Sequence, residues 1–224
     1  MKWKKCIFEA VDSTNKVAEG QEIGTVVLSK TQTEGRGRYG HTWTSPVGNL
    51  YMSAVLSMYG TNTPLMTFVV AVSIVEALKK IDISAMIKWP NDILLNDKKV
   101  AGILLECIDD KLIVGVGVNI VSHPTENLAY PATDLKGLVS PEILSDLILE
   151  TFDEYIDIFE TQGFEPIYCK MKSYLKGIGR PVIVRLPNQK INGIFKEFSQ
   201  SGALILQLPD KTEQEITAGS VFFA

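Results

Sequence analysis

The fold of this chain is constrained most by a succession of short runs of branched and aromatic residues in its first 120 residues, each bounded by turn formers. Runs of this length and composition predict β-strands. Seven of them follow one another, over 7–11, 25–29, 50–57, 85–89, 93–96, 100–107 and 112–119. We therefore expect a mixed or mostly antiparallel sheet.

Three segments between and after these runs carry helical patterns. Apolar residues run from 63 to 80 behind Pro64, a residue that favours the first helical turn, and lysines end this segment at the negative end of the helix dipole. Pro141 repeats this start, and apolar residues then recur at helical spacing over 141–163. A further helix is expected over 165–176. The sheet and the helices together predict an α+β fold.

The pattern changes after Gly177. Short alternating runs separated by turn residues then follow, similar to the strands of a small β-barrel, over 182–186, 191–197, 203–208 and 213–217. We therefore place a domain boundary near Gly177, with a larger domain over 1–176 and a small one over 177–224.

Charge and cysteine content narrow the class of protein. The net charge of −4 argues against a general nucleic-acid binder, because such proteins need clustered Lys and Arg to neutralise phosphates. Cys6, Cys107 and Cys169 are widely spaced and form no CxxC, which fits buried thiols in a reducing compartment. The longest apolar stretch, 65–78, is too short to span a bilayer. We expect a cytoplasmic protein that binds neither nucleic acid nor membranes.

The stretch that says most about chemistry runs from Gly35 to Trp43 and reads GRGRYGHTW. It matches the dinucleotide fingerprint GxGxxG, but a Rossmann turn must open a helix and be followed about 20 residues later by an acid. Turn formers follow here instead, and the next acid is Glu76. Because this window holds no acid, we expect the glycine backbone and the forks of Arg36 and Arg38 to bind an anion. The alternative is a flexible surface loop with two solvated arginines.

Two further stretches place turn residues and glycines within the expected sheet. The letters KWPND at 88–92 predict a turn between two apolar strands, where Asn91 and Asp92 need be nothing more than turn formers. Gly102 in the next strand and Gly115 in the strand after it indicate either β-bulges or a ligand that lies against the backbone. Two neighbouring strands that carry glycine therefore predict the floor of a pocket.

In combination, these motifs resemble the catalytic core of the biotin protein ligases. GRGRxG, KWPND, KxAGILxE and GxGxN occur in that order, with DSTN at 12–15 before them and the barrel-like runs after them. The resemblance implies a class II synthetase-like catalytic domain with an SH3-like C-terminal barrel, in the short form without a DNA-binding domain. It implies that biotin is activated with ATP and Mg²⁺ to biotinyl-5'-AMP and transferred to a lysine of a biotin carboxyl carrier protein. It leaves a homodimer open.

The resemblance also assigns roles to individual residues. Biotin would be bound by Ser13, Thr14, Asn15, Gln32, Gly35, Arg36, Gly37, Arg38, Lys99, Gly102 and Gly115. ATP would be bound by Arg38, His41, Trp43, Asn91, Asp92 and Asn119. The catalytic residues would be Arg36, Arg38, Lys99 and Asp92, and no resident metal site is implied. His41 stands where the family has arginine, and a solvated histidine is the alternative to a nucleotide contact.

Several of these residues have a simpler explanation when taken alone. Ser13 suits a helix N-cap, and Gln32 suits a solvated loop position. Trp43 is most often a packing residue, and Lys99 would discourage aggregation at a strand edge. Only the combination of these residues favours a site.

A cluster of cations suits the reaction that the resemblance implies. A carboxylate repels the phosphate that it must attack, so the site has to neutralise both and stabilise a crowded transition state. Arg36, Arg38 and Lys99 have this task, and Asp92 would orient or deprotonate the carrier amine. The rivals are a lipoate or octanoate protein ligase or transferase, and a non-catalytic biotin sensor or repressor. A sensor would have no need of Lys99 or the paired arginines.

Overall fold

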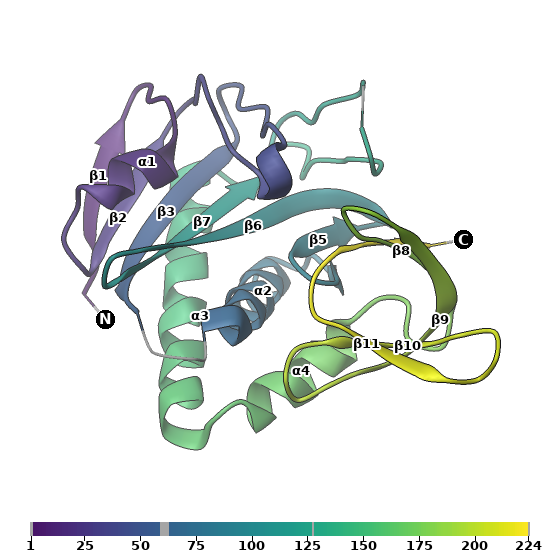
Figure 1. The fold of residues 1–224 in the computed structure, drawn as a ribbon. Coiled ribbons are helices and arrows are strands. Elements are labelled where there is room, and N and C mark those ends of the chain that lie inside the picture. The colour runs from purple at the N-terminus through teal and green to yellow at the C-terminus, as the bar shows by residue number, and fades with distance from the viewer. Residues whose placement is uncertain (1, 59–62, 127, 224) are drawn as a thin grey trace.

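The computed structural model describes residues 2–58, 63–126 and 128–223, and a seven-stranded sheet forms its centre (Figure 1). The strand order is β1-β2-β3-β7-β6-β5-β4. The strands are β1 Lys4–Phe8, β2 Thr25–Ser29, β3 Leu50–Ser57, β4 Met86–Lys88, β5 Asp92–Leu95, β6 Lys98–Ile108 and β7 Lys111–Val118. β1 pairs with β2 in parallel, and the other neighbours pair antiparallel. The predicted mixed, mostly antiparallel sheet is confirmed.

The first strand differs from its prediction. It spans Lys4–Phe8 and not 7–11, because its parallel register places Lys4 opposite Thr25 and Phe8 opposite Ser29. As an edge strand, β1 tolerates exposed lysines. A search for apolar runs therefore misses its first residues. Val11 forms an isolated bridge with Gln32 instead.

Helices cover both faces of this sheet. They are α1 Thr14–Glu19, α2 Thr63–Lys79, α3 Pro141–Gln162 and α4 Glu165–Tyr174, and a 3-10 turn, η1, spans Arg38–Gly40. The helix α1 packs on β2, β3 and β7, whereas α2 packs on β4, β5 and β6 with α3 against it. Figure 1 shows α1 and η1 on one side of the sheet and α2 and α3 on the other. The helix α1 packs mainly on β2, β3 and β7 among the strands of its face, so the loops that build the site lie beside it on that same face.

A second, five-stranded antiparallel sheet follows α4, in the order β11-β10-β9-β8-β12. Its strands are β8 Pro181–Arg185, β9 Lys190–Phe198, β10 Leu204–Gln207, β11 Glu213–Ile216 and β12 Ser220–Phe223. The first four lie within two residues of their predicted limits. β12 was not predicted, because its four residues SVFF carry too little alternation.

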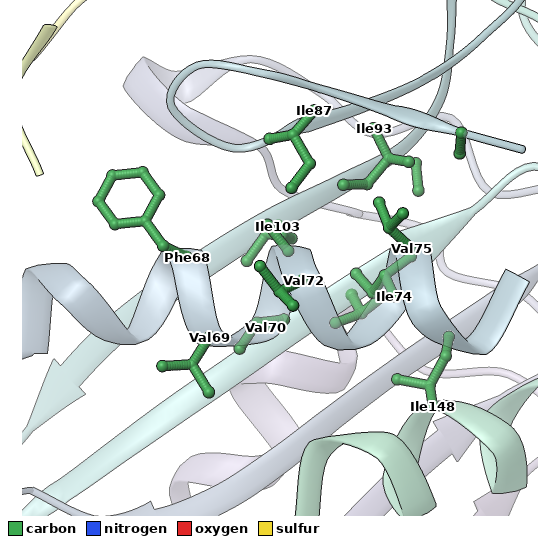
Figure 2. Packing of buried hydrophobic residues seen from close by; sticks show 14 of the residues in the cluster. Phe68, Val69, Val70, Val72, Ile74, Val75, Ile87, Ile93, Ile103 and Ile148 are labelled. Atoms are coloured by element: carbon green, nitrogen blue, oxygen red, sulfur yellow. The ribbon is translucent and has the colours of Figure 1, made fainter. Parts of the chain in front are cut away.

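The core is continuous from α2 to the second sheet. Figure 2 shows Phe68, Val72 and Val75 of α2 packed among Ile87, Ile93 and Ile103 of β4, β5 and β6. Phe68 also meets Phe198 of β9 in an edge-to-face pair, with ring centroids 4.9 Å apart. In addition, Trp89 Nε1 donates a 3.0 Å hydrogen bond to Gly202 O. These contacts hold the C-terminal sheet beside the turn that carries the KWPND motif.

Two expectations about cysteines and membranes can be compared with the structure. The prediction of buried thiols is wrong for Cys107 and Cys169, which are exposed near the end of β6 and on α4, while Cys6 is half-buried and all three are unpaired. Within the described ranges, no helix is long and apolar enough to cross a membrane.

Candidate active site

Three glycines on neighbouring strands form the floor of a pocket. Gly102 of β6 pairs directly with Gly117 of β7, and Gly115 lies two residues before Gly117 on the same face. A Cβ at Gly115 would lie 2.3 Å from Asn15 Oδ1, and one at Gly117 would lie 2.6 Å from the Trp43 indole. A Cβ at Gly102 would meet the same indole at 2.9 Å. Only glycine therefore allows these side chains to lie against the sheet.

One end of the pocket is polar and closely hydrogen-bonded. Gln32 Oε1 accepts from the backbone N–H of Thr14 at 2.8 Å and from its hydroxyl at 3.1 Å. Ser53 Oγ of β3 lies 2.7 Å from Thr14 Oγ1 and 2.6 Å from Asn15 Oδ1. Ser13 occupies the N-cap position of α1 but makes no capping hydrogen bond through its side chain, and it lines the pocket. This end can both donate hydrogen bonds to a small polar group and accept them.

The Gly35 to Trp43 stretch folds back on itself beside this floor. The backbone N–H of Gly37 donates to His41 O at 2.7 Å, and that of Trp43 donates to Gly35 O at 2.8 Å. Tyr39 at the tip has a φ of 56°, in the left-handed region. The glycine-rich segment is thus a hairpin-like loop and not the start of a helix.

The two arginines of this loop are held by partners. Arg38 Nη1 donates to Asn91 Oδ1 at 3.1 Å, and its Nη2 donates to Tyr39 Oη at 3.0 Å. Arg36 Nη2 lies 3.2 Å from Glu106 Oε2 and 3.5 Å from Glu19 Oε1. The prediction that acids are kept away from the arginines therefore fails for Arg36, because β6 and α1 bring carboxylates to it that are distant in sequence.

Trp43 lies flat on the glycine floor. Its indole covers Gly102 and Gly117, and Lys99 Nζ lies 5.2 Å from its ring centroid. Its Nε1 is buried and finds no hydrogen-bond partner among the residues that the structure describes. The residue as a whole is only half-buried, so one part of the ring faces the pocket.

Asp92 joins two lysines beneath the site. Lys99 Nζ lies 2.5 Å from Asp92 Oδ1, and Lys88 Nζ lies 2.6 Å from Asp92 Oδ2. Burial of Asp92 would raise its pKa, but the charges of Lys99 and Lys88 outweigh that effect and hold the pKa at about 2. Asp92 is therefore a carboxylate at neutral pH and a weak base.

Two cavities meet at the cationic residues. The first, a narrow one, is lined by Ser13, Thr14, Asn15, Gln32, Arg36, Gly37, Arg38, Trp43, Asn91, Lys99, Gly102, Ile103, Leu104, Gly115, Val116 and Gly117. The second takes in His41, Asn91, Asp92, Asn119, Tyr130 and Phe222. Both are lined by Gly37, Arg38, Trp43, Asn91 and Lys99. A group bound at this junction would face both spaces at once.

Nearly all residues singled out from the sequence line these cavities, with one exception. Gly35 lines neither cavity, and a Cβ there would lie 2.4 Å from Trp43 O and 2.7 Å from Ser45 Oγ. Glycine at position 35 lets the loop backbone pack closely against Trp43 and Ser45. His41 is exposed at the rim of the second cavity.

Sequence reasoning missed several residues of the site. Gly117 could have been found, because residues two apart on a strand share a face and Gly115 was already assigned to the floor. Ser53 and Phe222 gave no such signal, and Lys88, the first residue of the KWPND motif, was given no role of its own. Their roles depend on which strands become neighbours.

The two cavities differ in size and share a positively charged junction. The site consists of a narrow pocket with a polar end, joined through Arg38 and Lys99 to a second, larger cavity. Such a site defines a class of α+β protein that brings two anionic groups together at one point.

Comparison with known proteins makes this assignment specific. The Biotin/lipoate A/B protein ligase family model matches residues 7–120, and the Biotin protein ligase C terminal domain model matches residues 177–224. The chain belongs to the biotin/lipoate A/B protein ligase family. It is 37% identical over 234 aligned residues to the biotin-acetyl-CoA-carboxylase ligase of Paracoccus denitrificans, an alignment that covers 95% of this chain and 97% of that protein.

Two further relatives support the same family. The bifunctional ligase/repressor BirA of Bacillus subtilis is 34% identical over 89% of this chain and 68% of its own length. The structure of the biotin protein ligase from Aquifex aeolicus in complex with biotin and ATP matches with a TM-score of 0.87 and 29% identity, over 98% of both chains.

Proposed function

We propose that this chain activates biotin with ATP, forming biotinyl-5'-AMP, and transfers the biotin to a lysine of a biotin carboxyl carrier domain. The observation that carries the proposal is the junction of two cavities at Arg38 and Lys99. The ligases of Paracoccus and Aquifex support it, the latter through its complex with biotin and ATP. An enzyme that joins a carboxylate to a phosphate needs such a junction, where cations offset the charges of both.

Biotin is assigned to the first cavity. Its ureido group can donate and accept hydrogen bonds, which matches the polar end at Ser13, Thr14, Asn15 and Gln32. The rest of the molecule would extend over Gly115 and Gly102. The biotin carboxylate would then reach the loop residues Arg36, Gly37 and Arg38 and the opposite Lys99.

ATP is assigned to the second cavity. Trp43 offers an aromatic surface for adenine, and Asn91 and Asn119 line the space beside it. Asn119 Nδ2 donates to Thr133 O at 3.0 Å, and this bond fixes the amide. His41 would contact the nucleotide from the rim. The α-phosphate would lie at the junction, within reach of Arg38 and Lys99.

In the first step the biotin carboxylate oxygen attacks the α-phosphorus of ATP, and pyrophosphate leaves. Arg38 and Lys99 bring the two anions together and stabilise the charge that accumulates on the pentacoordinate phosphorus. Arg36 assists by closing over the biotin carboxylate. For this, its guanidinium group has to break its ion pair with Glu106 or to bind both carboxylates at once. In the second step the neutral amine of the carrier lysine attacks the carbonyl carbon, and AMP leaves.

Mg²⁺ is proposed to arrive with the ATP phosphates, as part of the substrate. In the described part of the chain, no group of three or more His, Cys, Asp or Glu side chains could hold a metal ion. Both Asp92 oxygens already accept hydrogen bonds from ammonium groups, which disfavours a cation there. Proteins often bind Mg²⁺ mainly through substrate phosphates, so a protein cage is not needed.

Asp92 is proposed to orient Lys99 and the incoming amine and not to deprotonate the amine. A carboxylate whose pKa lies at about 2 is a poor acceptor for a proton from an ammonium group. We further propose that the carrier lysine approaches along a third cavity between α2, β6 and the C-terminal sheet, because this cavity also reaches Arg38 and Asn91.

These assignments give each of the two predicted domains a role. Residues 1–176 would form the catalytic domain, and residues 177–224 a small C-terminal domain that closes the nucleotide cavity through Phe222. The three unpaired cysteines support a cytoplasmic location.

The proposal is tested by mass spectrometry of a carrier domain incubated with the protein, ATP, Mg²⁺ and biotin. We expect a mass increase of one biotinyl group on one lysine. The same reaction with lipoate or octanoate in place of biotin is the control for the rival activity. Modification by these acids and not by biotin would move the assignment to a lipoate or octanoate ligase, and no modification at all would leave only a binding protein.

A further inference from the structure

We propose that Lys88 is a positioning residue: it neutralises Asp92, so that Lys99 keeps its charge for the reacting carboxylate and phosphate. The inference rests on the proposed function and concerns a residue in the wall of the second cavity, whose ammonium group is bound to Asp92. Its basis is the geometry of three charged side chains, two of them buried.

Lys88 lies deeper than Lys99 on the same carboxylate. The side chain of Lys88 is 4% exposed and that of Asp92 is 11% exposed, whereas that of Lys99 is 27% exposed and lines both cavities. Each lysine contacts its own oxygen of Asp92. Lys99 can therefore meet a ligand from either cavity, whereas Lys88 lines only the second cavity and is almost wholly buried there.

Aromatic rings hold the Lys88 ammonium group in place. Its Nζ lies 4.7 Å from the ring centroid of Tyr130 and 5.9 Å from that of Phe222 in β12. Aromatic faces attract cations, and this attraction is larger where water is excluded. Arg185 stacks on Phe222, with Cζ 4.1 Å from the ring centroid. The C-terminal sheet thereby contributes to the position of Lys88.

Charge counting gives the reason for a second lysine. An isolated Asp92–Lys99 pair would be neutral, and it would offer little attraction to an incoming anion. With Lys88 included, two ammonium groups share one carboxylate, and the cluster has a net charge of one positive unit. Because Lys88 is enclosed, that charge acts through Lys99 at the junction of the cavities.

A buried lysine without a partner would lose its proton or unfold the site, so the carboxylate is required as well. The three residues therefore depend on one another. Asp92 fixes Lys99 in direction, and Lys88 prevents Asp92 from cancelling its charge.

The test uses biotin-dependent exchange of labelled pyrophosphate into ATP, which reports only the first half-reaction. For Lys88→Met we expect kcat to fall by about tenfold or more, while the KM values for biotin and ATP change by less than about threefold. The reason is that the crowding of negative charge is greatest in the transition state. Lys88→Arg retains the charge and is expected to recover at least about a third of the wild-type rate.

A double variant separates positioning from general damage. If Lys88 serves to neutralise Asp92, removing both charges leaves Lys99 with its own charge, and the amide oxygen introduced by Asp92→Asn can still accept a hydrogen bond from Lys99 and keep its direction. Lys88→Met/Asp92→Asn should therefore be at least as active as Lys88→Met. A merely structural role for Lys88 predicts that the two losses multiply. Lys170→Met is the matched control, because Lys170 also pairs with a half-buried carboxylate, Glu76, but far from the cavities.

The outcomes are distinct. If the wild-type protein shows no biotin-dependent exchange, the proposed function fails. If the wild type is active and Lys88→Met keeps its full kcat, or the losses of the double variant multiply, the inference about Lys88 is overturned alone. Should Lys88→Met not fold, Lys88→Gln, which keeps a polar group at the same depth, takes its place in both comparisons.

Discussion

At the scale of single residues, the site depends on side chains that lie where a Cβ would otherwise be. Asn15 and Trp43 reach the backbone of β6 and β7 only because Gly115, Gly117 and Gly102 carry no side chain. Trp43 in turn gives one face to the glycines and leaves another to the pocket. The depth of the pocket is therefore set by the three glycines beneath these side chains.

Arg38 is the residue whose loss should affect the first half-reaction most directly. It lines both cavities and is held by Asn91 at 3.1 Å. We expect Arg38→Ala to reduce biotin-dependent pyrophosphate exchange by about 100-fold or more, equivalent to ~3 kcal/mol of transition-state stabilisation. Arg180 is an exposed arginine at the start of the C-terminal sheet, and Arg180→Ala is the control that should leave the exchange rate unchanged. Unaltered exchange in Arg38→Ala would remove the loop from the reaction.

Gly115→Ala tests the floor of the pocket. The added methyl group would lie 2.3 Å from Asn15 Oδ1, so the asparagine has to move away from Ser53. We expect the KM for biotin to rise by roughly tenfold, equal to ~1.4 kcal/mol, and the KM for ATP to stay unchanged. Gly20→Ala is the matched control, because its nearest neighbour would be 3.8 Å away. Equal effects on both KM values would mean that Asn15 does not belong to the biotin end.

The pKa of Asp92 leads to a prediction about stability and pH. Its folded value of about 2 lies below the ordinary value of 3.8, so its ionisation stabilises the folded state above pH 3.8, and this contribution is lost as the pH falls to 2. We expect the difference in unfolding free energy between wild type and Asp92→Asn to be constant from pH 7 to 5. It should then decrease by about 2 kcal/mol between pH 4 and 2. Denaturant titrations at each pH measure it, and a change already between pH 7 and 5 would contradict the buried ion cluster.

Much of the site could be predicted from single residues and motifs. The residues that could not be predicted depend on contacts between distant parts of the chain. Arg38, Lys99 and Gly102 stand in motifs whose residue types already suit anion binding. Ser53 stands in no motif, and Lys88 stands in the KWPND motif without a role of its own; their roles come from β3 and β4, which bring them to Thr14 and Asp92. Contacts between residues far apart in sequence cannot be inferred from local pattern.

At the scale of elements, the sheet was easier to predict than its edges. β2 and β3 have their predicted limits because both are buried and therefore rich in apolar residues. β1 and β12 lie at the edges of their sheets and carry lysine or very few residues. For such strands, pairing partners decide the limits, and composition has less influence.

The loop from Gly35 to Trp43 is the element expected to respond to ligand. Few contacts beyond Arg36, Arg38 and the Trp43 indole tie it to the sheet, and glycine-rich loops often order around a substrate. We expect biotin with ATP to slow trypsin cleavage after Arg36 and Arg38 by about tenfold or more. Cleavage after Lys211, in a turn of the C-terminal sheet, is the internal control and should not change. Equal cleavage with and without ligands would show that the hairpin-like fold is complete before binding.

At the scale of the whole molecule, three cavities converge on one pair of residues. Arg38 and Asn91 line the first cavity, the second cavity and a third one bounded by α2, the middle of β6 and the C-terminal sheet. Under the proposed function, biotin, ATP and the carrier lysine would each approach this pair from a different cavity. The C-terminal sheet forms a wall of both the second and the third cavity, through Phe222 and Thr217 respectively.

This arrangement allows the two half-reactions to be separated by a substitution in the third cavity. Thr217 is exposed on the C-terminal sheet side of that cavity, and an arginine there would add both bulk and charge. We expect Thr217→Arg to slow biotin transfer to a carrier domain by about tenfold or more, while pyrophosphate exchange stays within about twofold of wild type. Gln189→Arg adds the same side chain to a turn of the same sheet away from the cavity, and it should leave both reactions unchanged. If Thr217→Arg transfers biotin at the normal rate, the carrier lysine enters from another side, whereas a parallel loss of exchange would show that this wall acts on the first half-reaction.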